Sequence, residues 1–184
     1  MECIIIREIT EIILGIVMII GFFSRRFRVM YKLPFSLIIG SLFITASLIE
    51  FFSGFPMEFF EFLAAIILLL MVEKFITANT KSAFRWYYFV ILTGITIAVV
   101  LLKRDIKYFH VGVLITLGTA SMRTGHNVGA FYWQYKEIFY LSAIFGFLAA
   151  GTYMISLYIL SDFLYFGGVM LFLSVIPELT PLRW

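Results

Sequence analysis

Long apolar runs separated by short polar segments dominate the chain. A membrane-spanning helix needs about 20 mostly apolar residues, and the chain has room for six or seven of them. The predicted helices cover approximately residues 3–23, 34–52, 57–75, 86–102, 108–122, 138–160 and 163–176. The pattern therefore predicts an all-α polytopic bundle of about seven transmembrane helices, with six as the alternative, in one transmembrane domain over residues 1–184.

Polar and turn-forming residues mark the predicted boundaries. Ser53–Pro56 has the composition of a tight turn, and Ser161–Asp162 is the predicted break between the sixth and seventh helices. Arg123–Glu137 is the longest predicted loop, and it leaves the fifth helix barely long enough to span. If that helix does not span, every later helix is inverted.

Composition supports a membrane location. Hydrophobic residues make up 62% of the 184 residues and charged residues only 14%, whereas soluble domains are roughly half apolar and a quarter charged. The mean hydropathy is +1.04. Cys3 is the only cysteine, so neither an intramolecular disulfide nor a cysteine-based metal site can form. We expect a multi-pass protein of the plasma membrane whose main partner is the lipid bilayer, with no nucleic acid.

The cations predict the orientation of the helices. Ser24–Lys32 is a basic loop that contains Arg25, Arg26, Arg28 and Lys32, and such loops stay on the cytoplasmic side. This places the N-terminus outside, the C-terminus in the cytoplasm, and ten cations inside against four outside. The ten are Arg25, Arg26, Arg28, Lys32, Lys74, Lys81, Arg85, Arg123, Lys136 and Arg183, and the four are Arg7, Lys103, Arg104 and Lys107.

Carboxylates gather on the opposite, outer side. Those near the outer ends of the first three helices are Glu8, Glu11, Glu50, Glu58 and Glu61. One interpretation is that they are solvated residues at the membrane boundary. The other is a vestibule that binds cations or protons, since ionisable groups within a membrane are costly and usually functional.

The second interpretation leads to a prediction about stability. Glu11, Glu50 and Glu61 lie on three consecutive helices, and consecutive helices are usually neighbours. Their carboxylates would then repel one another unless protons or cations intervene. We therefore predict that divalent cations or protons stabilise the protein through this cluster, although the identity of any metal is unknown.

Small residues recur at every fourth position in two of the helices. The two stripes are Gly112, Thr116 and Ala120, and Ser142, Gly146 and Ala150. This spacing favours close helix packing. Thr93 and Thr96, with Thr116 and Thr119, also leave open a polar solute path between the fourth and fifth helices.

The sequence contains none of the common catalytic or phosphate-binding motifs. His110 and His126 are expected at opposite ends of one helix, so they cannot share a metal and are interpreted as separate polar contacts. We expect no cofactor and no enzymatic activity. The leading prediction is a small sensor, scaffold or accessory subunit of a membrane complex, with protein subunits or a second copy as partners. The alternative is a transporter or channel for a cation or small solute that uses the outer carboxylates, and a membrane enzyme is third.

Overall fold

The computed structural model describes residues 2–23, 35–80, 85–128 and 133–175, and within these ranges it is all-helical, with no strand. The seven α-helices are α1 (Glu2–Phe23), α2 (Phe35–Ser53), α3 (Glu58–Thr80), α4 (Tyr87–Lys103), α5 (Phe109–Val128), α6 (Trp133–Met154) and α7 (Tyr158–Val175), and a short 3-10 helix, η1 (Ile106–Tyr108), precedes α5. The prediction of an all-α helical bundle is confirmed for the described residues. Among them, two segments are long and apolar enough to cross a membrane, Ser36–Ser53 of α2 and Tyr135–Met154 of α6.

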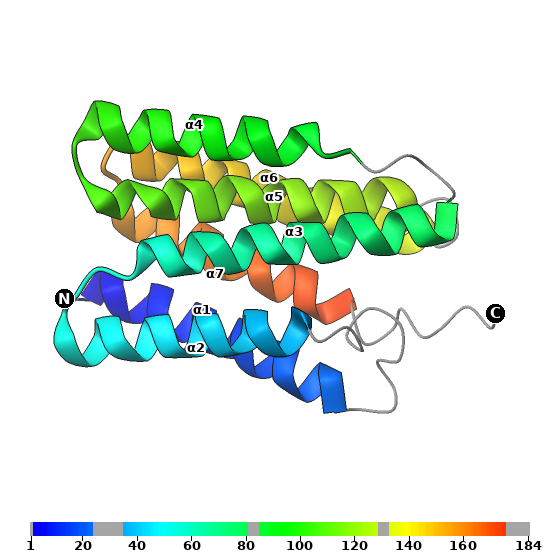
Figure 1. The fold of residues 1–184 in the computed structure, drawn as a ribbon, viewed down its shortest axis with the longest axis horizontal. Helices are drawn as coiled ribbons and strands as arrows, with labels where there is room; N and C mark the ends of the chain where they lie inside the picture. The colour runs from blue at the N-terminus through cyan, green and yellow to red at the C-terminus, as the bar shows by residue number, and fades with distance from the viewer. Residues whose placement is uncertain (1, 24–34, 81–84, 129–132, 176–184) are drawn as a thin grey trace.

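Six of these helices form a closed ring. Around the ring, α1 contacts α2, α2 contacts α3, α3 contacts α5, α5 contacts α6, α6 contacts α7, and α7 returns to α1. α4 lies outside the ring and packs along α5 (Figure 1). The ring encloses a central axis that side chains from several helices can reach.

The helices alternate in direction, so the connections gather at the two ends of the bundle. The start of α1 and the connections α2–α3, α4–α5 and α6–α7 lie at one end, on the left in Figure 1. We call this the acidic end, because the five predicted acids are near it. The cations in or next to the helix halves nearer the opposite end are Lys74, Arg85, Arg123 and Lys136. The basic loop with Arg25, Arg26, Arg28 and Lys32 lies outside the described residues, as do Lys81 and Arg183.

Apolar side chains fill the middle of the ring and also cover its outside. Leu14, Leu68 and Leu114, from three different helices, are buried. The outward positions carry exposed apolar residues as well, including Ile16, Ile38, Leu63, Ile95 and Ile144. Apolar side chains therefore form part of the outer surface of the bundle as well as its core.

The predicted loop Arg123–Glu137 is wrong, because α5 continues to Val128 and α6 already begins at Trp133. Polar side chains in the last turns of α5 find partners within the bundle. Arg123 pairs with Glu73 of α3, with Nε 2.5 Å from Oε1. Thr124 Oγ1 donates to the Ala120 carbonyl at 2.8 Å. The polarity therefore reflects buried hydrogen bonds rather than a loop, and α5 has 20 residues.

The predicted break at Ser161–Asp162 is also wrong, because both residues lie inside α7. The chain turns instead between Met154 and Tyr158. The amide of Leu157 donates to the Thr152 carbonyl at 2.9 Å, and the amide of Ser156 donates to the Tyr153 carbonyl at 3.0 Å. This pattern is a Schellman motif, and its left-handed position, usually a glycine, is held by Ser156 with φ 65°.

Both stripes of small residues face neighbouring helices. A Cβ atom added to Gly146 would lie 3.1 Å from the Gly118 Cα of α5, and one added to Gly112 would lie 2.5 Å from the Thr96 side chain of α4. Ser142 Oγ donates to the Gly168 carbonyl of α7 at 2.7 Å. The remaining members, Thr116, Ala120 and Ala150, are buried. These contacts support the packing interpretation over a solute path between α4 and α5.

Candidate functional site

All five predicted acids are buried together at the acidic end. Their side chains come from the first turns of α1, the last turn of α2 and the first turn of α3. The exposed fractions are 1% for Glu8, 0% for Glu11, 8% for Glu50, 0% for Glu58 and 0% for Glu61. The interpretation of these residues as solvated boundary groups is therefore wrong.

Three of the acids surround Arg7, and we call these four residues the Arg7 cluster. The guanidinium Nη2 donates to Glu8 Oε1 at 2.8 Å and also to Glu50 Oε1, and Nη1 lies 3.6 Å from Glu58 Oε1. Arg7 and Glu11 are four residues apart, a spacing at which two side chains can pair on one helix face. The described ion pairs of Arg7 are instead with Glu8 of α1, Glu50 of α2 and Glu58 of α3, so that two of them join α1 to its neighbours.

Glu50 also holds the α2–α3 connection. Its Oε2 accepts a hydrogen bond from the Met57 amide at 3.2 Å, just before α3 begins. The Gly54 amide donates back to the Glu50 carbonyl at 2.8 Å, and Gly54 adopts a positive φ of 65°. Glu50 therefore stabilises the turn between α2 and α3 and also forms an ion pair with Arg7.

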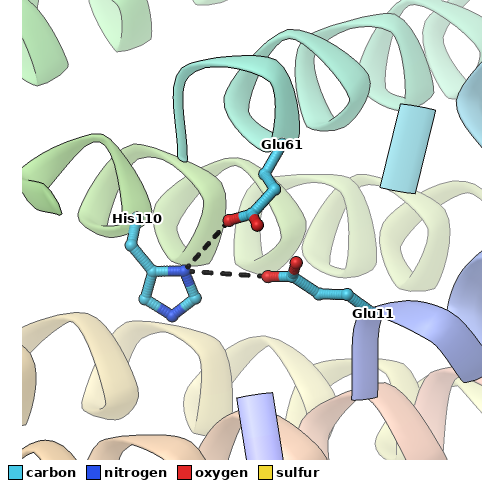
Figure 2. Close-up of side chains that lie close together, drawn as sticks. All are labelled: Glu11, Glu61 and His110. Atoms are coloured by element: carbon cyan, nitrogen blue, oxygen red, sulfur yellow. Dashed lines mark ion pairs between the residues drawn. The ribbon is translucent and has the colours of Figure 1, made fainter. Parts of the chain in front are cut away.

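The other two acids face His110, and we call these three residues the His110 cluster (Figure 2). Glu11 reaches it from α1, Glu61 from α3 and His110 from the first turn of α5. His110 Nδ1 lies 3.8 Å from Glu11 Oε1 and 3.9 Å from Glu61 Oε2. All three side chains are fully buried. The sequence interpretation, which left His110 as a separate polar contact, is corrected by this placement.

Several polar atoms of this cluster have no hydrogen-bond partner within the part of the chain that the structure describes. Both ring nitrogens of His110, both carboxylate oxygens of Glu61 and Oε1 of Glu11 are buried in this state. Glu11 Oε2 accepts a hydrogen bond from Ser47 Oγ at 3.1 Å. A buried polar group without a partner costs about 1–3 kcal/mol, so these five atoms favour either a proton shared among them or a bound ion.

Aromatic rings position the imidazole. The His110 ring centroid lies 5.2 Å from that of Tyr153 of α6 and 5.5 Å from that of Tyr165 of α7. Tyr165 is itself buried, and its hydroxyl has no hydrogen-bond partner among the described residues. The two tyrosine rings therefore restrict the position of the imidazole.

A cavity of about 230 Å³ leads from the acidic end to the Arg7 cluster. We call it the vestibule. Its lining residues are Arg7, Glu50, Glu58, Asp105, Lys107, Tyr108, Tyr153, Tyr158 and Asp162. Asp105 and Lys107 are exposed, whereas Asp162 is buried. The vestibule therefore connects the surface with Glu50, Glu58 and Asp162.

The charges of this region do not balance by themselves. Six buried carboxyl groups, those of the five acids and of Asp162, face the single guanidinium of Arg7. Placing unpaired charges in a low-dielectric interior costs several kcal/mol per ion. Protons or cations must therefore accompany these carboxyl groups, and the arrangement can bind or exchange either.

Sequence reasoning missed four residues of this region, namely Arg7 as the central cation, Ser47, His110 and Asp162. A signal existed for His110, because the predicted topology places it at the same end as Glu11 and Glu61. His126 lies in the last turn of α5 at the opposite end and is exposed. The two histidines are thus separate, as predicted, but only His126 is outside the site.

No protein-family model, no curated protein and no solved structure matches this chain, so these residues themselves carry the functional argument.

Proposed function

We propose that this protein is a multi-spanning membrane transporter or channel that takes up a cation, a proton or a metal ion, through the vestibule at its acidic end. The observation that carries this proposal is the burial of six carboxyl groups and one histidine around a single arginine. Ionisable residues inside a membrane bundle mark ion pathways and proton relays. These buried groups favour transport over the role of sensor or accessory subunit, which was the leading prediction from the sequence.

The membrane location is supported by the outer surface. Large apolar side chains are exposed on all seven helices, among them Ile20, Phe52, Phe60, Val90 and Phe163. Soluble monomers rarely expose continuous apolar patches of more than a few hundred Å². Hydrocarbon chains are the solvent that such a surface fits, and the two apolar segments of α2 and α6 are long enough to cross them.

The Arg7 cluster and the His110 cluster are two adjacent candidate sites for a cation at the acidic end. The vestibule exposes the Arg7 cluster to a cation that arrives from the acidic end. One oxygen each of Glu8, Glu50 and Glu61 lies within 4.8 Å of the others. Glu61 of the His110 cluster therefore lies next to Glu8 and Glu50 of the Arg7 cluster, and a cation that reaches the Arg7 cluster can pass to the His110 cluster by way of Glu61.

Flux into proteoliposomes tests the proposal. The purified chain would be reconstituted with a pH-sensitive dye or a divalent-cation dye inside the vesicles. We expect influx driven by an imposed gradient, and we expect Glu61→Gln to reduce it at least tenfold. Glu137→Gln is the matched control, since Glu137 is exposed at the opposite end. Influx that is absent, or that is equal for Glu61→Gln and the wild type, contradicts the proposal.

One observation favours the sensor as a second candidate. At the opposite end of the bundle Arg123 and Glu73 form a buried ion pair between α5 and α3. A cation bound at the acidic end would then occupy a closed site and change the packing of the ring. In that case the reconstituted protein binds a cation at Glu61 but shows no flux.

A further inference from the structure

We propose that Glu11, Glu61 and His110 form a binding site for one divalent transition-metal ion of the Zn²⁺, Fe²⁺ and Co²⁺ class. The inference deepens the proposed function, because it names the cation of the same buried region, and it rests on that function in treating the carboxylates as a cation site. The three residues come from α1, α3 and α5. A bound ion would therefore join three helices of the ring.

The spacing of the ligand atoms suits a shared ion better than a hydrogen bond. The two distances from His110 Nδ1, 3.8 Å to Glu11 Oε1 and 3.9 Å to Glu61 Oε2, exceed the hydrogen-bond range. Metal–ligand bonds to imidazole and carboxylate are about 2.0–2.2 Å, so ligands of one ion stand roughly 3–4 Å apart. One ligand atom from each of the three residues lies within 4.8 Å of the others.

His110 supplies an observation that the acids alone do not. Its side chain is fully buried, and neither ring nitrogen has a hydrogen-bond partner among the described residues. Figure 2 shows Nδ1 directed between the two carboxylates. An imidazole buried in this way loses its hydrogen bonds to water, and coordination of an ion through Nδ1 replaces one of them.

The donor set selects the class of ion. Imidazole nitrogen suits zinc, iron, copper and nickel, whereas calcium and magnesium prefer oxygen ligands alone. Two carboxylates also neutralise one divalent ion, so that the occupied site adds no net charge to the interior. Three protein ligands leave a fourth coordination position open, as in catalytic zinc sites. Water or a carboxylate of the Arg7 cluster can occupy it.

Neighbouring residues orient the ligands. Ser47 Oγ binds Glu11 Oε2, which directs Oε1 of the same carboxylate toward His110. The rings of Tyr153 and Tyr165 pack beside the imidazole. Such supporting contacts commonly contribute 10–100-fold to metal affinity, which is about the effect that we expect for Ser47→Ala.

Cobalt binding tests the assignment with a direct readout. The full chain, purified in detergent and stripped with a chelator, would be titrated with Co²⁺ and followed by visible absorption. We expect one Co²⁺ per chain, displaced by Zn²⁺ but not by equal concentrations of Mg²⁺ or Ca²⁺. His110→Gln should weaken binding at least tenfold. His126→Gln is the matched control on the same helix and should bind as the wild type does.

Three results would overturn the assignment: no stoichiometric binding to the wild type, equal affinity for His110→Gln, or equal competition by Mg²⁺. If His110→Gln does not fold, Ser47→Ala takes its place, and unchanged affinity of that variant overturns the site. Glu61-dependent flux without Co²⁺ binding would refute this site and leave proton transport standing. Co²⁺ binding without flux would refute transport and leave the site standing.

Discussion

Arg7 is the residue on which the buried charges of the acidic end depend. Its guanidinium is the only cationic group of the Arg7 cluster, and it joins carboxylates from α1, α2 and α3. Removing one partner from a buried ion pair destabilises a protein by about 3–5 kcal/mol, because the other charge remains without compensation. Arg7 therefore has a structural role that the sequence did not reveal, since its position predicted only that it is one of the four cations on the outer side.

We predict that Arg7→Gln lowers the free energy of unfolding by about 3–5 kcal/mol. The measurement is denaturation in mixed micelles, followed by circular dichroism. Arg104→Gln removes an exposed cation at the same end and should change stability little. The double variant Arg7→Gln/Glu50→Gln removes one of the stranded carboxylates, so it should be more stable than Arg7→Gln alone. A double variant that is as unstable as the sum of its single changes would contradict this role.

At this scale, the sequence identified the acids but not their surroundings. The spacing of Glu8 with Glu11 and of Glu58 with Glu61 is enough to place each pair on one helix face. It cannot tell whether that face points to water or to the ring interior, which depends on how α1, α2 and α3 pack. His110 was missed although the predicted topology placed it at the same end as these acids, because a single histidine on an apolar helix carries no periodic signal for the direction in which it faces.

At the scale of the helices, apolar runs predicted where helices form better than where they end. The turn between α2 and α3 was recognisable because Gly54 and Pro56 mark it. The turn between α6 and α7 has neither residue type, and the polar pair Ser161 and Asp162 was therefore interpreted as the break between the two helices. Ser161 is in fact buried, with its hydroxyl bound to the Ala149 carbonyl at 2.8 Å. Side-chain partners of this kind arise from tertiary packing, which no local pattern displays.

The α6–α7 turn yields a prediction in the stabilising direction. Ser156 has φ 65°, and a left-handed conformation costs an L-residue roughly 1–2 kcal/mol. Ser156→Gly should therefore raise the free energy of unfolding by about 1 kcal/mol, measured as an increase in melting temperature. Ser174→Gly, at an exposed position near the end of α7, should not stabilise. A lower melting temperature for Ser156→Gly would show that this turn is not a Schellman motif.

The contact between α5 and α6 yields the opposite prediction. Because a Cβ at Gly146 would meet the backbone of α5, Gly146→Leu should force the helices apart and cost about 1–3 kcal/mol or more. Gly151 lies on the same helix with nothing within 4 Å of an added Cβ. Gly151→Leu should therefore leave the melting temperature unchanged or raise it. Equal melting temperatures for the two variants would place Gly146 on an open face.

At the scale of the whole molecule, the bundle combines an apolar exterior with a polar interior at one end. We predict that the acidic end faces outward. In a Cys3→Ser background, Lys103→Cys should be labelled from outside intact cells by an impermeant maleimide. Lys136→Cys, at the opposite end, should be labelled only after permeabilisation. Both positions are exposed in the structure, so lack of access cannot arise from burial. The reverse labelling pattern would invert the proposed topology.

If the buried carboxyl groups exchange protons for a cation, infrared difference spectroscopy will detect the change in their protonation. Adding Zn²⁺ to the metal-free protein should lower the infrared absorption of protonated carboxyl groups and raise that of carboxylates. The change should be strongly reduced in Glu61→Gln and preserved in Glu137→Gln. A wild-type spectrum that is unaffected by Zn²⁺ and by changes in pH would contradict this exchange, because the buried acids would then neither bind the ion nor release protons.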